Sequence, residues 1–334
     1  MKTPKVVRWF GGKSHLLPEI LKRIPPHTTY VEPFGGGAAV LFAKAPSPIE
    51  VYNDIDSAIV NFFRVLRETH LRDELVRQLE LTPYSREEYH NYRAWAKAGE
   101  PETELPYNPQ SPFTLEEQRA IEKARRFFVL NQQGFSAIYA GSWRFAHNDP
   151  RVVEQYWSTL DKLHAVGNRL KRVQIEHDSF EHVIPRYDHE EAFFFLDPPY
   201  VPDTRVSPEV YRHEMTIEDH KRLVEILLLT EGMVMLTGYD HPVYDPLVEH
   251  GWKKEHVEVE CKVSPTFRDP NRKRTRRVET IWMNPQCVKR QQGQLDIFAM
   301  LAISDSNDEG NTPAAHAPER LQFESDESDT QPRR

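Results

Sequence analysis

The sequence predicts an α/β fold built on a mostly parallel sheet, with a second domain inserted into it and a disordered tail after it. Three observations predict this arrangement. Short β-rich segments alternate with helical ones in the first and last parts of residues 1–290, a middle region lacks this alternation, and the composition changes sharply near residue 290. The 334 residues, of which 39% are hydrophobic, suffice for about two domains.

The expected elements follow one another in the order typical of such a sheet. Segments rich in β-branched and aromatic residues predict strands, and apolar residues at helical spacing predict helices. We expect parallel strands at residues 28–33, 49–54, 191–196 and 233–237, helices at 38–43, 57–79 and 114–130, and late antiparallel strands at 252–262 and 279–283.

The middle of the chain has a different organisation. Nothing between residues 85 and 186 resembles a strand–helix–strand unit, and a charged helical segment there is followed by an aromatic and glycine-rich stretch. We therefore expect one domain to be formed by residues 1–65 and 176–290, and a mainly helical domain to be inserted at residues 66–175. Residues 291–334 are rich in Ser, Asp, Glu, Pro and Gln, which predicts a disordered acidic tail.

The net charge, taken alone, disfavours a protein that binds nucleic acid. The chain has 43 basic and 51 acidic side chains, which gives a formal charge of -8. Nine acidic and three basic residues fall in residues 291–334, so the tail carries -6 and the rest of the chain only -2. The negative net charge therefore does not exclude a protein that binds nucleic acid.

Several other classes of protein do not fit the sequence. The longest apolar runs are far shorter than the roughly 18 residues of a membrane helix. The N-terminus lacks the apolar stretch of a secretory signal. The only two cysteines, Cys261 and Cys287, have no neighbouring Cys/His pattern, so we expect no metal site, no disulfide framework and a location in the reducing cytoplasm.

Two polar turns follow the first two predicted strands, at the sheet edge where α/β proteins bind ligands. Residues 34–38 form a glycine-rich turn between a strand and a helix, which lets the backbone approach a ligand, although a tight turn without a ligand is the alternative. Asp54 follows Phe34 by 20 residues, where nucleotide-binding folds place a carboxylate on a ribose. A helix N-cap is the alternative for this Asp.

A third turn, Asp197-Pro198-Pro199-Tyr200, ends the strand predicted at residues 191–196. Its two prolines remove backbone donors, so the turn presents carbonyls and a carboxylate beside an aromatic ring. Acceptors next to a ring suit a planar ligand that bears an amino group. A simple Pro-Pro strand terminator is the alternative.

Together the motifs resemble the Dam-type, or D12 class, family of adenine-N6 DNA methyltransferases. The resembling segments occur in the family's order: Trp9-Phe10-Gly11-Gly12-Lys13, Glu32 to Ala38, Asn53-Asp54-Ile55-Asp56, Asp178-Ser179-Phe180 and Asp197 to Tyr200. The resemblance extends from residue 5 to about residue 285. One departure is Ala38, which stands where the family has glycine and should be tolerated if its φ is negative.

The resemblance implies a Rossmann-like sheet that binds S-adenosyl-L-methionine and a double-stranded DNA substrate, whose adenine N6 receives the methyl group. The catalytic residues would be Asp197, Pro198 and Tyr200, which hydrogen-bond and stack on a flipped adenine. The cofactor would be bound by Trp9, Gly12, Lys13, Phe34, Gly36, Asp54, Asp178 and Asp197. The resemblance implies no metal.

DNA contacts are expected at basic residues and in the inserted domain, which resembles the family's target-recognition domain. The segment from Arg268 to Arg277 has six basic residues and one acidic residue between two predicted strands, which predicts a phosphate-binding loop. The residues expected at DNA are Arg8, Arg272, Lys273, Arg274, Arg276 and Arg277. A second basic cluster, Arg119, Lys123, Arg125 and Arg126, fits either DNA or an ordinary helix face. The match at residues 131–136 is loose, so the target sequence stays unassigned.

The tail contains one further motif. Gln294, Leu295, Ile297 and Phe298 resemble the peptide by which bacterial proteins bind the replication sliding clamp, and packing of this segment onto the protein itself is the alternative. Two alternatives apply to the whole chain: a catalytically inactive DNA-binding relative, and an amino-methyltransferase that acts on RNA or on a protein glutamine.

Overall fold

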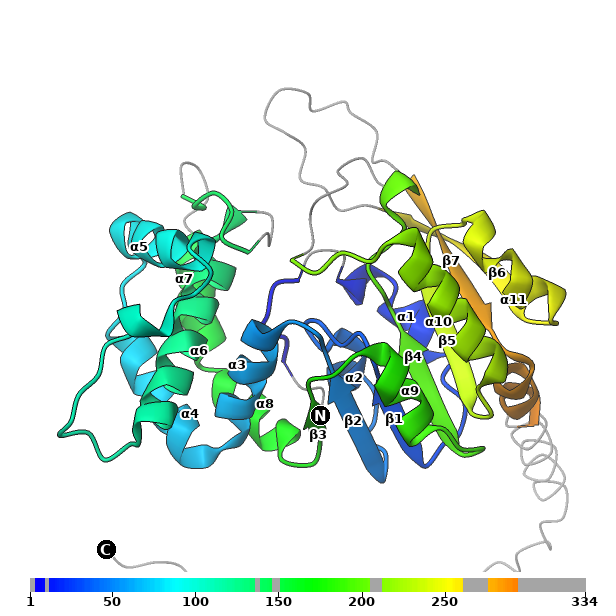
Figure 1. Ribbon diagram of the computed structural model, residues 1–334, viewed down its shortest axis with the longest axis horizontal. Coiled ribbons are helices and arrows are strands. Elements are labelled where there is room, and N and C mark those ends of the chain that lie inside the picture. Colours follow the sequence, from blue (N-terminus) through cyan, green and yellow to red (C-terminus); the bar gives the residue numbers. More distant parts are fainter. Residues whose placement is uncertain are drawn as a thin grey trace, which may run out of the picture. The chain divides into compact units, whose positions relative to one another are not determined.

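A mixed sheet of seven strands organises the chain (Figure 1). The computed structural model describes residues 4–9, 12–135, 139–145, 151–204, 212–260 and 276–293. The strands follow the order β3-β2-β1-β4-β5-β7-β6, which confirms the predicted α/β fold. Their bounds are β1 (Thr29–Glu32), β2 (Ile49–Asn53), β3 (Gln174–Glu176), β4 (Ala192–Leu196), β5 (Met233–Gly238), β6 (Lys253–Glu260) and β7 (Arg276–Met283).

The strand order creates a crevice at the carboxyl ends of β1 and β4. β1 pairs in parallel with β2 on one side and with β4 on the other, and β3 and β5 extend the parallel part. β7 runs antiparallel to both β5 and β6, as expected for the late strands. β2 lies on one side of β1 and β4 lies on the other. The loops that follow β1 and β4 therefore lead to opposite sides and leave room for a ligand between them.

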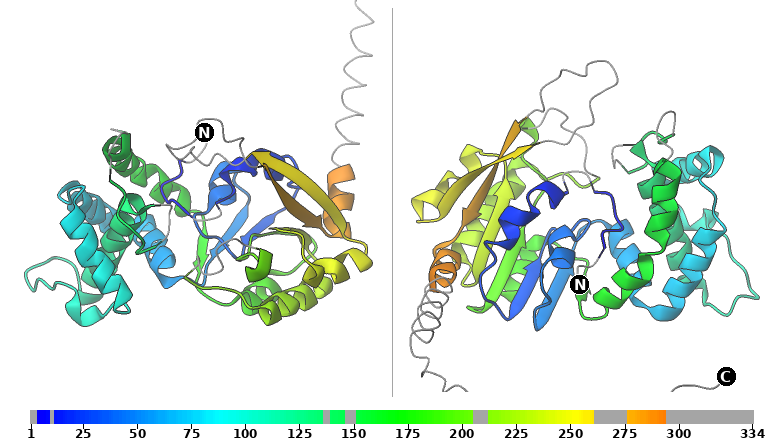
Figure 2. Two further views of the ribbon diagram at one scale, coloured as in Figure 1. Left: turned by 90° about the horizontal axis from the view of Figure 1, so that it is seen from above. Right: turned by 180° about the vertical axis from the view of Figure 1, so that it is seen from behind.

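Helices cover both faces of the sheet (Figures 1 and 2). Alternate strand residues face opposite sides, so Tyr30 packs in one apolar cluster and Val31 in the other. One face is covered by α9 (Phe180–Tyr187), α10 (Ile217–Leu229) and α11 (Asp245–Glu249), and the other by α1 (Leu17–Leu21), α2 (Ala39–Ala43) and α3 (Ser57–Arg67).

A group of helices lies beside the sheet on the side of β3 (Figure 1; Figure 2, right). It comprises α4 (Thr69–Glu80), α5 (Arg86–Lys97), α6 (Leu115–Gln133), α7 (Arg151–Leu160) and α8 (Leu163–Leu170). The predicted helix at residues 114–130 is confirmed as α6, which Thr114 and Glu117 start with a capping box. The single helix expected at residues 57–79 is wrong, because Glu68 is extended (ψ 117°) and separates α3 from α4.

Two further expectations about secondary structure are corrected. β3 was not expected; it is an edge strand of three residues, too short to show a period-two pattern. β7 begins at Arg276, so Arg276 and Arg277 lie in a strand and not in the predicted loop, because the ladder with β6 continues to the pair Glu260 and Arg276. The remaining residues of that loop, 268–275, lie outside the described residues.

Contacts group residues 1–292 into one compact unit. The expected boundary between residues 65 and 66 falls inside α3, and the one between 175 and 176 falls inside β3. Within the described ranges, no helix is long and apolar enough to cross a membrane.

Candidate active site

Two side-chain amides at the end of α6 position the N-terminal segment that carries Trp9. The Asn131 side chain accepts a hydrogen bond from Arg8 N (2.9 Å) and donates one to Arg8 O (2.7 Å), so it pairs with this backbone as a neighbouring strand would. Gln132 Nε2 donates to the carbonyl of Val6 at 2.9 Å. The sequence match at residues 131–136, although loose, thus includes residues that hold the N-terminal motif in place.

The glycine turn is fitted closely against Trp9. Gly36 has a φ of +45°, and a Cβ on it would lie 2.5 Å from Trp9 Nε1, so a side chain here would displace the indole. Gly36 N donates to Asp54 Oδ2 at 2.7 Å, and the Tyr52 hydroxyl donates to Gly36 O at 2.8 Å. The turn is therefore tied to the end of β2.

Ala38 does not have the negative φ that we expected for an alanine at this position. Its φ is 53° and its ψ is 38°, a left-handed conformation, and it is the N-cap of α2. This conformation costs a residue with a Cβ roughly 1–2 kcal/mol, a cost that glycine avoids. The Ala38 side chain is fully buried in this conformation.

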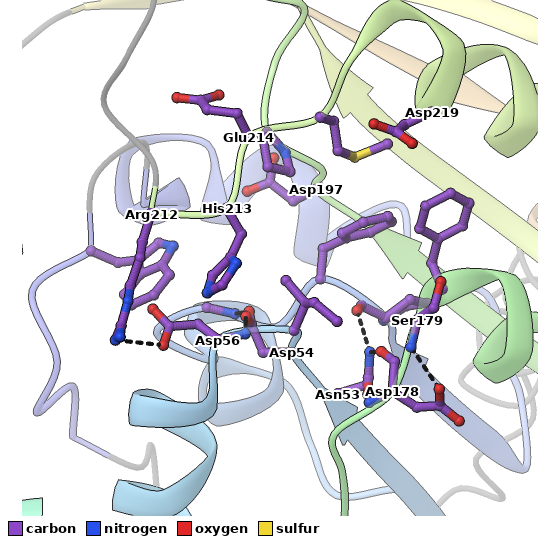
Figure 3. A pocket seen from close by; sticks show the side chains of 18 of the residues that line it. Asn53, Asp54, Asp56, Asp178, Ser179, Asp197, Arg212, His213, Glu214 and Asp219 are labelled. Atoms are coloured by element: carbon purple, nitrogen blue, oxygen red, sulfur yellow. Dashed lines mark hydrogen bonds and ion pairs between the residues drawn. The ribbon is translucent and has the colours of Figure 1, made fainter. Parts of the chain in front are cut away.

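A cavity of about 340 Å³ lies at the carboxyl ends of β1, β2 and β4 (Figure 3). Six of the predicted cofactor residues line it: Trp9, Phe34, Gly36, Asp54, Asp178 and Asp197. The other two, Gly12 and Lys13, line an adjoining cavity of about 40 Å³, which shares several of the same walls. The structure therefore brings all eight together.

Asp54 is held at the end of β2 by backbone donors. Its Oδ2 accepts from Gly36 N, and its Oδ1 accepts from Asp56 N at 2.8 Å. Burial raises the pKa of Asp54 to about 7, although these two hydrogen bonds lower it. The same residue is one of the carboxylates on the cavity wall in Figure 3.

Asn53, for which the sequence predicted no role of its own, joins three segments of the cavity wall. Its Nδ2 donates to the carbonyls of Pro33 and Asp178, and its Oδ1 accepts from Asp178 N at 2.9 Å. The Asp178 carboxylate itself pairs with His182 and Arg186, which lower its pKa. Asn53 thus fixes the position of Asp178, while Asp178 Oδ1 and Oδ2 are already engaged by α9.

Asp197 follows β4 with its carboxylate fixed through one oxygen. Its Oδ1 forms an ion pair with Lys13 Nζ at 2.8 Å and accepts from Thr237 Oγ1 at 3.1 Å. Among the described residues, Oδ2 has no hydrogen-bond partner. Burial raises the pKa of Asp197, and the charge of Lys13 opposes this rise.

Tyr200 is buried next to Asp197 and does not line the cavity. Tyr200 is only 6% exposed, its ring centre lies 4.7 Å from that of Tyr239 in an edge-to-face arrangement, and its hydroxyl donates to Glu279. Of the predicted turn, Asp197 and Pro199 line the cavity, and Pro198 does not. Stacking of a ligand on Tyr200 would therefore require neighbouring segments to move.

Glu32, the last residue of β1, has an unusual environment. It is 2% exposed and lines the smaller cavity together with Lys13 and Asp197. Its Oε2 has no hydrogen-bond partner among the described residues. Burial raises the pKa of Glu32 to about 8, against the lowering effect of Lys44.

Arg212 closes one side of the larger cavity (Figure 3). Its guanidinium forms ion pairs with Asp56 (3.3 Å) and Glu100 (2.7 Å) and lies 5.0 Å from the centre of the Tyr139 ring. The residues that follow it, His213 to Met215, also line the cavity. Arg212 thus binds the segment before α10 to Asp56, which follows β2, and to Glu100 in the helical part.

The expected DNA-binding and tail residues lie in different places. Arg8 Nη1 donates to the carbonyls of Gln132 (3.3 Å) and Gly134 (2.7 Å), so its guanidinium caps the end of α6. Arg276 and Arg277 begin β7. Arg272, Lys273 and Arg274 lie outside the described residues, as do the tail residues Gln294, Leu295, Ile297 and Phe298.

Comparison with known proteins identifies the family. The family model of the D12 class N6 adenine-specific DNA methyltransferases matches residues 9–243. The chain belongs to this class. It is 26% identical to the Type II methyltransferase M1.LlaDCHI of Lactococcus lactis subsp. cremoris over 250 residues, which are 72% of this chain and 82% of the relative.

Other similar proteins agree with this class. The chain is 24% identical to the DNA adenine methylase of Escherichia coli (strain K12) over 240 residues, 70% of this chain and 77% of that enzyme. It is 26% identical to the DNA N-6-adenine-methyltransferase of Escherichia phage P1 over 227 residues, which cover 66% of this chain but only 28% of that protein. As a D12 class enzyme, the chain transfers a methyl group to adenine N6 of DNA and uses a methyl donor.

Proposed function

We propose that this methyltransferase is site-specific for double-stranded DNA, takes its methyl group from S-adenosyl-L-methionine and acts in the cytoplasm, where its DNA substrate is. The observation that carries the mechanism is the arrangement of Asp197. Two side chains hold its Oδ1, and its Oδ2 has no partner among the described residues, beside a cavity at the switch point of the sheet. This arrangement suits a fixed acceptor for an amino group.

The residues around the two cavities fit S-adenosyl-L-methionine. Phe34, Ile55 and Phe180 supply apolar walls for a nucleoside base, and Asp54 is the carboxylate for ribose hydroxyls. Glu32 supplies an unpartnered, buried carboxylate oxygen at the smaller cavity. A cavity of about 40 Å³ is large enough for one ammonium group, so we assign the donor's amino group to Glu32.

The chain's own residues orient the adenine. When bound, S-adenosyl-L-methionine supplies an electrophilic methyl group on a sulfonium. Asp197 Oδ2 accepts a hydrogen bond from the adenine amino group, the carbonyl of Pro198 accepts the second, and together they direct the N6 lone pair. Fixed orientation and exclusion of water then provide most of the rate. Tyr200 stacks on the flipped base once DNA binding has opened the segments that bury its ring.

The experiment that tests this function is sequencing of modified bases in DNA from cells that express the chain. We expect N6-methyladenine at one short recognition sequence, which also assigns the target. An equal distribution over all adenines would contradict site specificity. Absence of N6-methyladenine, in cells where the folded protein is detected, would contradict the function itself.

The geometry favours an active enzyme over a catalytically inactive relative. Lys13 and Thr237 hold the Asp197 carboxylate from two different elements, and a chain that only binds DNA has no need for this arrangement. For the alternative substrates, RNA or a protein glutamine, incubation of the purified protein with labelled donor and a mixture of DNA, RNA and protein would place the label outside DNA.

We propose that the helical insertion at residues 66–175 reads the DNA target and that the loop residues Arg272, Lys273 and Arg274, with Arg276 and Arg277, contact phosphates. The support is the density of positive charge from Arg268 to Arg277. The second basic cluster gives no such support, because Arg119, Lys123, Arg125 and Arg126 all form ion pairs with Glu102 or Glu122.

We further propose that Gln294, Leu295, Ile297 and Phe298 bind a sliding clamp. The support is their sequence alone: three apolar side chains at the start of an acidic tail. A pull-down with purified bacterial clamp should recover the full chain and lose the Leu295→Ala/Phe298→Ala double variant. Equal recovery of both proteins would contradict clamp binding.

A further inference from the structure

A hollow of about 560 Å³ lies between the N-terminal segment that carries Trp9 and helix α7. Four basic residues line it, Lys5, Arg8, Arg144 and Lys162, and no Asp or Glu is among the described residues that do so. The other lining side chains include Gln132, Gln155, Ser158 and Thr159, which are polar and uncharged. The wall is therefore positive and otherwise neutral.

Three of the positive charges of this hollow, those of Lys5, Arg8 and Arg144, repel their neighbours. Partial burial and the charge of Arg8 lower the pKa of Lys5, and burial together with the charge of Arg144 lowers the pKa of Arg8. Arg144 Nη2 donates to the neutral Gln155 at 3.1 Å, and Lys162 has no ion-pair partner within the described part of the chain. Positive charges thus lie together along the wall of this hollow, and none of the described Asp or Glu side chains lines it.

The contrast with the neighbouring α6 shows that this arrangement is not general in the helical part. There, Arg125 and Arg126 share Glu122, and Lys123 pairs with Glu102, so each cation faces a carboxylate. Cations gathered on one wall, next to a ligand cavity, indicate a binding site for an anion. Trp9 lines both this hollow and the 340 Å³ cavity, so the anion would be bound beside the active site.

We propose that this hollow binds backbone phosphate of the DNA substrate and so fixes the strand next to the target adenine. The inference rests on the assignment of DNA as the substrate. Four cations around one hollow next to the active site suit a polyanion, and the DNA backbone is the polyanion that must pass there. Lys162 and Arg144 contact the phosphate, whereas Arg8, whose Nη1 is engaged by α6 carbonyls, contributes charge.

The test is the salt dependence of DNA affinity for Lys162→Gln, with Lys171→Gln as the matched control. Both lysines flank α8, but Lys171 is exposed at its other end and does not line the hollow. For Lys162→Gln, the slope of log Kd against log salt should fall by about 0.9 relative to the wild type, the value for one lost phosphate contact. For Lys171→Gln it should stay unchanged. An unchanged slope for Lys162→Gln would overturn the proposal.

Two further measurements distinguish DNA phosphate binding from a structural role of Lys162 and from binding of a free anion. Without DNA, Lys162→Gln should melt at the same temperature as the wild type, because Lys162 has no ion-pair partner within the described part of the chain; a lower melting temperature would indicate a structural role of Lys162 and contradict the proposal. Duplex DNA should raise the melting temperature of the wild type more than that of Lys162→Gln, whereas inorganic phosphate at equal ionic strength should not distinguish them. Discrimination by inorganic phosphate alone would assign the hollow to a free anion.

The rate of methyl transfer distinguishes loss of phosphate binding at the hollow from loss of the methyltransferase function. At low salt and saturating DNA, Lys162→Gln should still transfer methyl groups at the wild-type rate, because Lys162 lines neither of the two cavities that Asp197 lines. Loss of transfer under these conditions, with Asp197 and the donor site intact, would contradict a role limited to the DNA backbone.

Discussion

Two carboxylates at neighbouring strand ends, the partly buried Asp197 and the buried Glu32, differ in what surrounds them. Asp197, after β4, has Lys13 and Thr237 on one oxygen. Glu32, at the end of β1, has an oxygen without a hydrogen-bond partner among the described residues. The first is thus paired with a cation in the folded chain, whereas burial favours the protonated form of the second until a cation binds beside it. Their roles in substrate orientation and in donor binding follow from this difference.

Glu32→Gln should stabilise the ligand-free protein at alkaline pH. The pKa of Glu32 is about 8 in the folded chain and 4.5 when unperturbed, so between these values the folded chain holds a proton that the unfolded chain has lost. The free energy of unfolding of the wild type therefore falls as pH rises through this window, by at most about 1.4 kcal/mol per pH unit. Denaturant titrations of both proteins at pH 5, 7 and 9 should show the difference grow in favour of the variant.

The same substitution should weaken binding of the donor. A hydrogen bond to a charged group contributes about 1.5–3 kcal/mol, so the affinity for S-adenosylhomocysteine, which has the same amino group, should fall roughly 10- to 100-fold. Calorimetric titration measures this, and an analogue that lacks only the amino group should bind both proteins equally. If that analogue discriminated between them as strongly, Glu32 would not be the ammonium ligand.

Thr237→Val should lower the rate of transfer without changing donor affinity. The hydroxyl is one of two groups that fix Asp197 Oδ1, and valine has nearly the same shape. Loss of one hydrogen bond to a charged carboxylate corresponds to about 1.5–3 kcal/mol, or a roughly 10- to 100-fold lower kcat. Thr237→Ser, which keeps the hydroxyl, is the control and should recover most of the rate; an equal loss in both variants would indicate a packing effect.

The end of α6 depends on a residue 124 positions before it in the chain. Arg8→Met should destabilise the protein by about 1–3 kcal/mol, because the carbonyls of Gln132 and Gly134 lose a charged donor. Urea denaturation measures this loss. If stability were unchanged while DNA affinity fell, Arg8 would act through the DNA contact that the sequence resemblance implies and would not stabilise α6.

Elements with a strong local pattern could be predicted from the sequence. The apolar run of β4 and the turn signals after β1 and β2 are local, so these strands and the carboxylates at their ends were found. The break at Glu68 could not be seen, because helical spacing continues on both sides of it. The short edge strand β3 has no pattern of its own.

The site could be predicted only where its residues belong to motifs. Trp9, Asp54 and Asp197 stand in such motifs and line one cavity. Thr237 and Glu279 carry no local signal, because their roles arise from the sheet. β5 pairs with β4 and brings Thr237 to Asp197, and Glu279 of β7 accepts a hydrogen bond from Tyr200. Nor could the sequence indicate that Tyr200 is buried, since this depends on Tyr239 and Glu279.

The net charge of -8 describes the chain poorly, because its charges are unevenly distributed. Residues 291–334 carry -6, and residues 1–292 form a compact unit of their own. A chain that ends at Gln292 should therefore keep its melting temperature within about 2 °C and its kcat within about twofold, since less than about 0.5 kcal/mol is at stake. Thermal melting and transfer assays measure both, and a large loss of either would mean that the tail supports the folded enzyme.

The central claim is that Asp197 orients adenine N6 for transfer from S-adenosyl-L-methionine. The direct measurement is a single-turnover reaction with labelled donor and an unmethylated duplex that contains the target, followed by mass spectrometry of the nucleosides. The wild type should give N6-methyladenine, and Asp197→Ala should give none while it still binds the same DNA. Label on a cytosine, or transfer by Asp197→Ala at the wild-type rate, would contradict the account.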